Sequence, residues 1–239
     1  LIPDIYETGP EYYTFWFHNR FTLHVTDPGQ QVWLNFRGIN YRAEIFLNGH
    51  RVNHDTHEGM FLRQKYLITP FLSKDGNNSL AVIVHPPDPV GNPNGGQGGD
   101  GTIARSVTQQ YSPGWDWVAP VRDRNTGIWD KVSLEITGSL DVRHPWVKTR
   151  VPGVRIPGGN QQPAFLDVSA EVVNASNVEK SGVLTAEWER KPYQVPFMLA
   201  PGETKMISFP EIRVENPRLW WPNGMGSPEM YDIAFKVEE

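Results

Sequence analysis

The sequence predicts an all-β protein, a jelly-roll β-sandwich followed by an immunoglobulin-like β-sandwich. Three observations support this fold class. The 239 residues include 21 prolines and 22 glycines, which interrupt the chain too often for long helices. Val, Trp, Tyr and Phe are concentrated in short segments that often alternate with polar residues, as half-buried strands do. Turn residues separate these segments at intervals of roughly ten residues.

The first predicted domain comprises residues 1–138. Its early strands are predicted at residues 12–22, 31–38, 42–47, 61–67 and 79–85. Asp27-Pro28-Gly29 is the predicted turn between the first two. Asn48-Gly49 predicts a two-residue hairpin that leads into a return strand at Arg51. Short strands joined by tight turns at this spacing are typical of a jelly roll.

A stretch rich in Pro and Gly interrupts this domain after His85. Residues 86–101 read PPDPVGNPNGGQGGDG and predict a long functional loop or lid, because long loops without a role are uncommon. In residues 128–137 apolar and polar residues then alternate without a break. We expect one strand here, which completes the sandwich. Gly138 is the predicted domain boundary.

The second predicted domain comprises residues 139–239. A strand from Leu140 leads into a connection rich in Pro and Gly that runs to Gly159. Pro201-Gly202 is one predicted turn. Four further strands are predicted at residues 165–174, 183–190, 204–214 and 230–238. This spacing fits an immunoglobulin-like sandwich without a disulfide. The last predicted strand runs to Glu239 without a tail, and we therefore expect a fragment of a longer polypeptide.

Composition excludes several classes of function. The net charge of −5, without a basic run, argues against nucleic acid as the main partner. No apolar stretch approaches the roughly 18 residues of a membrane-spanning helix. The absence of cysteine excludes disulfides, thiolate metal sites and a cysteine nucleophile. The compartment stays open, with a periplasmic or secreted location expected for a bacterial source.

Residues 107–131 are the candidate functional stretch because they combine three tryptophans with several charged and amide side chains. Pro113, Gly114, Pro120 and Gly127 exclude a long helix here, so we expect Trp115-Asp116-Trp117 on a bent loop between strands. Indole rings pack against the C–H faces of sugars while carboxylates and guanidinium groups bind their hydroxyls. The stretch therefore favours a carbohydrate as ligand. The alternative is a tryptophan pair in the core and a surface ion pair.

Other motifs carry less information. The string Gly96 to Gly101 matches the dinucleotide pattern GxGxxG, but it follows prolines in an all-β chain, where no βαβ unit is expected. His54 and His57 have a spacing compatible with a metal, but no third ligand is evident and a turn-and-strand role is favoured. No acid and base pair is recognisable, so no catalytic residue is predicted.

Two long stretches of the sequence resemble glycoside hydrolase family 2. Residues 33–49, ending in LNG, together with HEGMF and LITPFLSKDGNNSLAVIV, resemble its sugar-binding, galactose-binding-like jelly roll. LAPGETKMISFPEIRVENPRLWWPNGMGSPEMYDIAFKV resembles its immunoglobulin-like domain. GGQGGDG, QQYSPGWDW and RDRNTGIWDKV are most similar to the branch of endo-β-mannosidases, exo-β-glucosaminidases and β-mannosidases.

The resemblance implies a division of labour. The two catalytic glutamates of this retaining family lie in a (β/α)8 barrel, and no residues remain here for such a barrel. The jelly roll of the family lends a loop to the subsite for the non-reducing sugar. Carried over to this sequence, Trp115, Asp116 and Trp117 match that loop, with Asp116 as the expected acceptor of sugar hydroxyls. Further substrate-binding candidates by position in the same stretch are Asp100, Arg122 and Asn125.

The implied partners are a mannoside or glucosaminide and the catalytic barrel of the same protein, without a cofactor. Two alternatives stay open: a free-standing carbohydrate-binding module, and a structural or interaction fragment without a ligand. If part of the site lies on the barrel, we also expect an exposed apolar patch near Trp220 and Trp221, where the barrel would dock.

Overall fold

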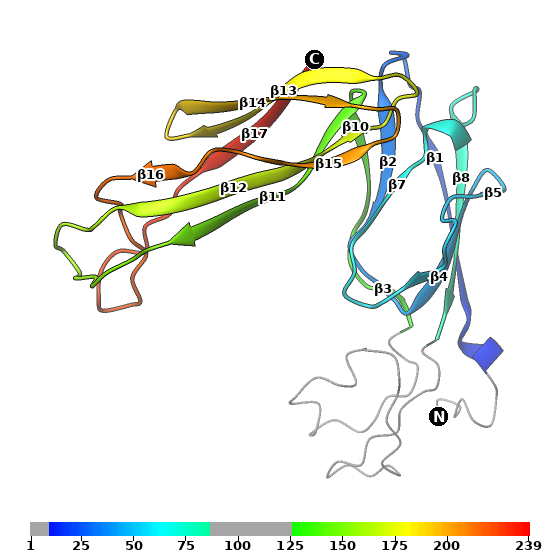
Figure 1. The fold of residues 1–239 in the computed structure, drawn as a ribbon. Helices are drawn as coiled ribbons and strands as arrows, with labels where there is room; N and C mark the ends of the chain where they lie inside the picture. Colours follow the sequence, from blue (N-terminus) through cyan, green and yellow to red (C-terminus); the bar gives the residue numbers. More distant parts are fainter. Residues whose placement is uncertain (1–9, 87–125) are drawn as a thin grey trace, which may run out of the picture. The chain divides into compact units, whose positions relative to one another are not determined.

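The computed structural model describes residues 10–86 and 126–239 and divides into two compact units, Leu1–Thr137 and Gly138–Glu239 (Figure 1). Each unit is built of β-sheets, and the predicted all-β fold is confirmed. The helical elements of the described ranges are two short 3-10 helices, η1 (Pro10–Tyr13) and η2 (Thr69–Phe71). Within these ranges no helix has the length and apolar character needed to cross a membrane.

Unit 1 is the predicted jelly roll, and its paired strands are antiparallel. One sheet has the order β1 (Phe15–Thr22), β8 (Asn77–His85), β4 (Arg42–Leu47) and β5 (His50–Arg51), with β6 (His57–Glu58) also paired to β4. The other has the order β10 (Val132–Thr137), β2 (Gln31–Phe36) and β7 (Gln64–Leu67). A separate two-stranded sheet joins β3 (Ile39–Asn40) to β9 (Gly127–Ile128).

The core of unit 1 follows from the alternation of side chains along three central strands. In each strand every second residue is buried between the two main sheets, and these residues are Val32, Leu34, Phe36, Ala43, Ile45, Leu47, Leu80, Val82 and Val84. Successive side chains of a strand point to opposite faces, so a register shift by one residue would expose the whole set.

The two predicted turns of unit 1 form as expected. Asp27 accepts a hydrogen bond from the backbone N–H of Gly29 at 2.8 Å. Asn48 and Gly49 both have positive φ, 51° and 82°, as the hairpin turn requires. The Asn48 side chain also accepts a hydrogen bond from the Ser79 N–H at 2.8 Å, which ties the hairpin to β8.

Unit 2 is the predicted immunoglobulin-like sandwich. One sheet has the order β11 (Leu140–Arg150), β12 (Ala164–Asn174) and β15 (Thr204–Ser208), with β16 (Ile212–Val214) also paired to β12. The other has the order β14 (Lys191–Leu199), β13 (Lys180–Trp188) and β17 (Ile233–Glu238). Its core lies between these sheets and includes Leu166, Val168, Ala170, Val172, Leu184, Ala186, Leu199 and Ile207.

Several strand predictions need correction. The strands predicted at residues 12–22 and 61–67 begin later, at Phe15 and Gln64, and Tyr12 and Tyr13 belong to η1. Residues 128–137 do not form one strand, because the chain bends between β9 and β10 at residues 129–131. Residues 204–214 are divided into β15 and β16 around Pro210, which cannot donate to a ladder. β14, which contains Pro192 and Pro196, is not among the predicted strands. It forms because β14 is an edge strand, where a missing N–H on the solvent side costs little.

Asn174 is the most enclosed polar side chain of unit 2. It is fully buried, and its amide nitrogen donates to the carbonyl oxygens of Val178, Leu199 and Ala200 at 2.7, 3.3 and 3.0 Å. Its amide oxygen accepts from the N–H and the hydroxyl of Ser176 at 3.0 and 2.7 Å. The side chain therefore joins the end of β12 to the end of β14.

We expect Asn174→Asp to destabilise unit 2 by about 3 kcal/mol, because it places a carboxylate against carbonyl oxygens in a buried site. Urea unfolding measures the change. Gln194→Glu makes the same amide-to-acid change on the exposed face of β14 and should leave the midpoint nearly unchanged. Equal effects of the two substitutions would contradict the role assigned to Asn174.

His57 is a buried titratable side chain of unit 1, with 4 % of its surface exposed. Neither ring nitrogen makes a hydrogen bond of good geometry within the described residues. Burial lowers the pKa of His57 because it disfavours the imidazolium, and the nearby backbone groups of Ile39 and Gly59 oppose this effect only in part. Burial therefore favours the neutral form of His57 in the folded protein.

This lowered pKa predicts a loss of stability in acid. As the pH falls through about 6.5, the ordinary pKa of histidine, His57 takes up a proton more readily in the unfolded chain than in the folded chain, so the free energy of unfolding falls until the folded form is protonated as well. His57→Gln should remove this dependence between pH 7.5 and 5, as followed by chemical unfolding. The matched change at exposed His54 should not, and identical pH profiles for wild type and His57→Gln would contradict the account.

Candidate functional site

All the substrate-binding residues expected from the sequence fall between residues 87 and 125, outside the described part of the chain. They are Asp100, Trp115, Asp116, Trp117, Arg122 and Asn125. The strings GGQGGDG and SPGWDW fall there too. The structure shows where this segment leaves the jelly roll and where it returns. β8 ends at His85 before the segment, and β9 begins at Gly127 after it.

The base is closed by the pairing of β3 with β9. Ile39 pairs with Ile128, and Asn40 pairs with Gly127. Gly127 has a φ of 148°, a conformation that residues with a side chain rarely adopt. Asn40 is buried as well. The two ends of the segment therefore emerge from an ordered part of the jelly roll, as functional loops on a rigid scaffold do.

Trp129 fixes the chain directly after β9. Its indole N–H donates to the carbonyl oxygen of Met60 at 3.0 Å, and its ring meets Phe61 edge to face with centroids 6.2 Å apart. Gly38 lies beneath the ring, where an added Cβ would come within 2.3 Å of it. Trp129 thus makes structural contacts, but 48 % of its surface is exposed, so it is not a core tryptophan of the kind that the alternative expects.

Asp130 also has a structural partner. Its carboxylate lies 3.4 Å from the guanidinium of Arg37, and about half of the Arg37 side chain is exposed. A partly exposed pair of this kind contributes on the order of 0 to 1 kcal/mol. Asp130 therefore belongs to the base of the segment, and it provides a control position for the acids within it.

A polar hollow lies on the outer face of the β1-β8-β4 sheet beside this base. Its volume is about 470 Å³, and its lining residues are Glu11, Thr14, Trp16, Arg42, His85 and Pro86. Two rows of cross-strand neighbours on this face form its floor. Trp16 lies opposite Ile83, which lies opposite Glu44, and Arg42 lies opposite His85. Pro86 is the last residue described before the segment 87–125, so the hollow adjoins its attachment point.

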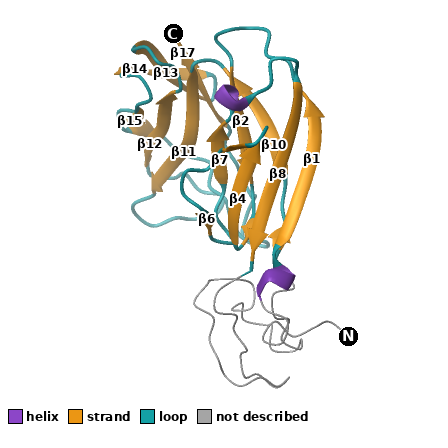
Figure 2. Cartoon of the chain, turned by 90° about the vertical axis from the view of Figure 1, so that its right-hand side faces the viewer, coloured by secondary structure: helices purple, strands orange, loops and turns teal. Residues whose placement is uncertain are grey.

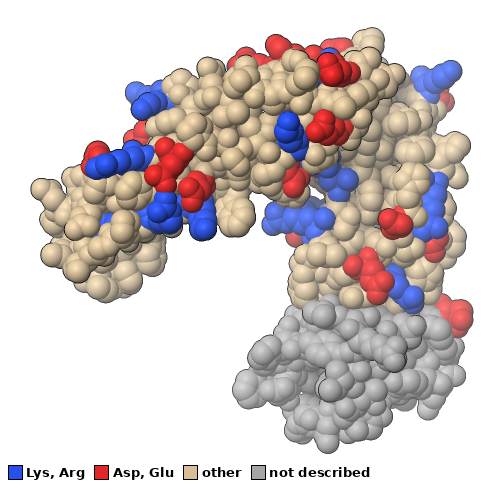
Figure 3. Space-filling view, viewed as in Figure 1, with Lys and Arg blue, Asp and Glu red and all other residues tan. Residues whose placement is uncertain are grey.

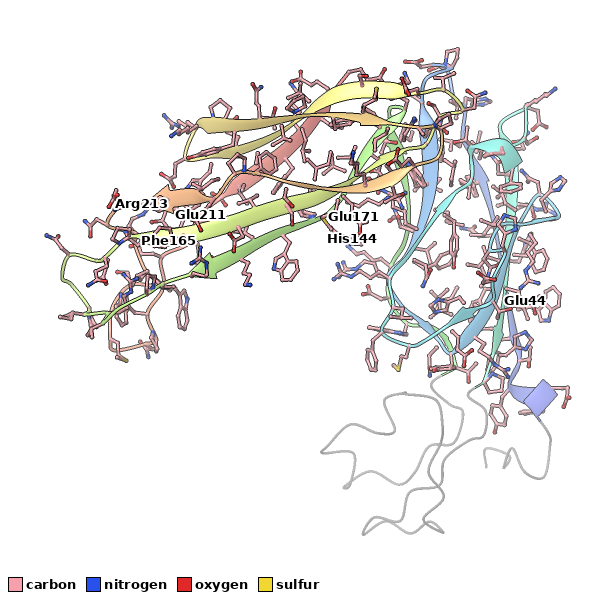
Figure 4. All side chains as sticks on the ribbon, viewed as in Figure 1. Glu44, His144, Phe165, Glu171, Glu211 and Arg213 are labelled. Atoms are coloured by element: carbon pink, nitrogen blue, oxygen red, sulfur yellow. The ribbon has the colours of Figure 1, made fainter. Side chains whose placement is uncertain are left out.

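Glu44, labelled in Figure 4, pairs with two charged groups on this face of the sheet. One carboxylate oxygen lies 3.0 Å from Nε2 of His85, and the other lies 3.5 Å from the guanidinium of Arg51. Trp16 is 70 % exposed, so its indole ring is open to a ligand. An exposed indole beside guanidinium, imidazole and carboxylate groups can pack on a sugar ring and bind its hydroxyls.

The sequence analysis missed the residues of this hollow. Trp16, His85 and the β4 residues Arg42 and Glu44 come from three strands that are far apart in the sequence, and only strand register brings them together. The available signal was the alternation of residues 12–22, which places Trp16 opposite to Phe15 and Phe17. The His54 and His57 pair does not form a joint site, since His57 is buried and His54 is exposed. Among the described residues no group of three His, Asp or Glu side chains could hold a metal.

Unit 2 carries a separate apolar groove of about 310 Å³, and Trp220 and Tyr231 are among its lining residues. The exposed fraction of Trp220 is 58 %, and Trp221 is partly buried. Arg218 lies over the ring of Tyr231 at 4.8 Å and pairs with Glu189 at 3.0 Å. An exposed apolar side chain is therefore found at Trp220, in the region where the sequence analysis expected a patch.

The surface charge shows no single sign on the face that Figure 3 presents. Lys and Arg side chains are interspersed there with Asp and Glu side chains. The described ion pairs follow the same pattern, for example Lys65 with Glu135 at 3.0 Å. The polar hollow also combines both signs of charge. Such surfaces suit a neutral polyol better than a polyanion.

The relatives found by comparison with known proteins are glycosidases. The mannosylglycoprotein endo-β-mannosidase of Lilium longiflorum is 40 % identical in an alignment 248 residues long. The alignment covers 99 % of this chain and 25 % of that protein. The exo-β-D-glucosaminidase of Arthroderma benhamiae is 30 % identical, over 90 % of this chain and 22 % of that protein. The crystal structure of the exo-chitosanase of Amycolatopsis orientalis matches with a TM-score of 0.69 and 25 % identity, over 93 % of this chain and 23 % of that one.

The chain thus spans about a quarter of the length of the curated relatives that it matches. Two family models cover most of it. The model described as the glycosyl hydrolase 2 galactose-binding domain-like family matches residues 9–130, and the model of the glycosyl hydrolases family 2 matches residues 150–239. The first corresponds to the jelly roll and the second to the immunoglobulin-like sandwich. The chain belongs to glycoside hydrolase family 2.

Proposed function

We propose that this chain is the non-catalytic N-terminal part of a retaining, β-mannosidase-type glycosidase, and that its jelly roll lends a substrate-contacting loop to an active site on a (β/α)8 barrel. The observation that carries the proposal is the match of 99 % of the chain to one quarter of an endo-β-mannosidase at 40 % identity. Carbohydrate hydrolysis is then the activity of the whole polypeptide, to which this part contributes binding.

The proposal divides the chemistry between two parts of the enzyme. A retaining mechanism needs an acid/base and a nucleophilic carboxylate about 5 to 5.5 Å apart. The family resemblance places both on the barrel. The jelly roll then supplies contacts to hydroxyl groups of the sugar. Such contacts raise kcat/KM because they hold the reacting bond in place and stabilise the transition state.

Within the segment 87–125, Asp116 is the proposed acceptor of a sugar hydroxyl, with Trp115 and Trp117 as walls of the subsite. Asp100, Arg122 and Asn125 are proposed as further contacts. The support is that both ends of this segment leave from an ordered base, held by the β3–β9 pairing and by Trp129. A loop with fixed ends loses less conformational entropy when it binds a ligand.

The proposed partner of unit 2 is the catalytic barrel. The groove beside Trp220 offers an apolar surface, and Arg218 and Glu229, which lie 4.0 Å apart at its wall, add a polar rim. Exposed apolar patches of this kind mark interaction sites. The proposal accounts for a large aromatic side chain at a place where it buries little surface in the isolated chain.

One observation favours a second candidate, a free-standing carbohydrate-binding module. The hollow beside Trp16 combines an exposed indole with Arg42, Glu11 and His85, and these groups suffice in kind to bind a sugar without a second domain. The two candidates differ in what the isolated chain can do. A module binds sugar by itself, whereas a half-site needs its barrel.

We expect Asp116→Ala in the full-length enzyme to lower kcat/KM on an aryl β-mannoside by about ten- to a hundredfold. The reason is the loss of one charge-assisted hydrogen bond, worth roughly 1.5 to 3 kcal/mol. The melting temperature should stay unchanged.

Asp130→Ala is the matched control, because Asp130 pairs with Arg37 at the base of the segment. It should change kcat/KM less than about threefold, since an exposed ion pair contributes little. A full-length enzyme whose kcat/KM is unaffected by Asp116→Ala would refute the role proposed for the loop.

A further inference from the structure

Both attachment points of the candidate loop are tied to one short stretch of the jelly roll, formed by β3 and the residue after it. Tyr41 donates its backbone N–H to the carbonyl oxygen of His85, the last residue of β8, at 3.4 Å. Ile39 pairs with Ile128 of β9, at the point where the chain returns. The departure and the return of the loop therefore depend on the same few backbone groups.

The residues directly after β6 brace this base from a second side. The backbone N–H of Gly59 donates to the carbonyl oxygen of Tyr41 at 3.1 Å. The carbonyl oxygen of the next residue, buried Met60, accepts the indole N–H of Trp129 at 3.0 Å. The backbone N–H of Trp129 donates in turn to the carbonyl oxygen of Gly38 at 3.2 Å. β3, β9 and the residues after β6 thus form one hydrogen-bonded unit.

His57 lies where the two sides of this unit meet. It stands on β6 directly opposite Ala43 of β4, and Figure 2 shows β6 beside β4. The imidazole ring lies near the backbone groups of Ile39 on one side and of Gly59 on the other. Only 4 % of the His57 surface is exposed. The ring therefore packs between the chain that holds β9 and the chain that holds Trp129.

The surroundings of His57 suit a neutral ring. Neither of its nitrogens has a hydrogen bond of good geometry to another described residue. Its charged neighbours are Glu58 on β6, which favours the imidazolium, and Arg42 on β4, which lies opposite Glu58 in the strand register. β3, β9 and the two residues after β6 contribute no titratable side chain. A proton on the ring would thus be a buried charge without a hydrogen-bonded partner among these elements.

We propose that His57 is a positioning residue of the loop base, whose neutral ring keeps the base closed and whose protonation opens the β3–β9 pairing and the two Trp129 bonds while the rest of the jelly roll stays folded. The strengths of the surrounding elements carry this choice. β3, β6 and β9 have two residues each, and β3 and β9 form a sheet of their own. β4 and β8 instead supply the core between the main sheets. Short pairings outside the core open at a lower free energy than core strands.

The direction of the pH effect follows from burial. Burial lowers the pKa of His57 in the closed base, whereas an open base lets water hydrate the imidazolium. As the pH falls through about 6.5, the equilibrium constant for opening therefore rises, by up to about tenfold per pH unit, until the closed form is protonated as well. At neutral pH the base stays closed.

Hydrogen exchange in the 239-residue chain, followed by NMR at pH 7 and pH 5, tests this inference. The protection factors of the backbone and indole N–H groups of Trp129 should fall by about tenfold or more at pH 5. Low concentrations of urea should leave this exchange unchanged, because a local opening exposes little surface, but should speed the exchange of Val82 in the core. Protection of Trp129 that does not change with pH, or that responds to urea as Val82 does, would overturn the proposal.

Two histidine substitutions assign the effect to one ring. His57→Gln replaces the ring by an amide that does not titrate, so the protection of Trp129 should be the same at both pH values. His54→Gln, at an exposed position just before β6, should retain the pH dependence of the wild type. A pH dependence that persists in His57→Gln would show that another group titrates and would overturn the proposal. The urea experiment on the wild type decides the matter even if His57→Gln does not fold.

The inference and the proposed function fail separately. That the base positions substrate contacts rests on the proposed function, because the contacts are assigned to the loop that the base holds. The exchange measurements do not use glycosidase activity. A negative exchange result therefore overturns the role of His57 and leaves the proposed function standing, whereas a loop that proves irrelevant to catalysis leaves the opening of the base in acid unaffected.

Discussion

The jelly roll depends on one constraint, the burial of every second side chain along β2, β4 and β8. Nine apolar residues from these strands form the core, and all of them are at most 8 % exposed. Because neighbouring side chains in a strand point to opposite faces, the same register places Arg42, Glu44 and His85 on the outer face. Core and polar hollow are therefore two consequences of a single pattern.

The base of the candidate loop shows how this scaffold serves a binding site. The sheet delivers the chain to His85 and receives it again at Gly127, and the β3–β9 pairing holds the return point. Trp129 then fixes the bend before β10 through its bond to Met60. The substrate contacts themselves are left to the segment between these points. A rigid base with the contacts on a loop is the usual way in which a sandwich acquires specificity without a change of fold.

The sequence predicted the fold class and most strands, because alternation and turn chemistry are local signals. Asn48-Gly49 and Asp27-Pro28-Gly29 form the expected turns for that reason. The predictions that were wrong depend on contacts between residues that are distant in the sequence. Lys191–Leu199 is a strand despite two prolines because it lies at a sheet edge. The bend at Trp129 depends on a contact with Met60, 69 residues away. The hollow beside Trp16 was unpredictable without the register of three strands. The loop residues of the candidate site stay predictions, since they lie outside the described ranges.

The central claim is that this chain holds part of a sugar site and not a whole one. Isothermal titration of the 239-residue chain with mannose, glucosamine and a mannose-containing N-glycan core tests it most directly, with the full-length protein titrated in parallel. The account predicts no binding by the chain tighter than about millimolar, or −4 kcal/mol, and measurable binding by the full-length protein. Tighter binding by the isolated chain would contradict it and identify a self-sufficient carbohydrate-binding module.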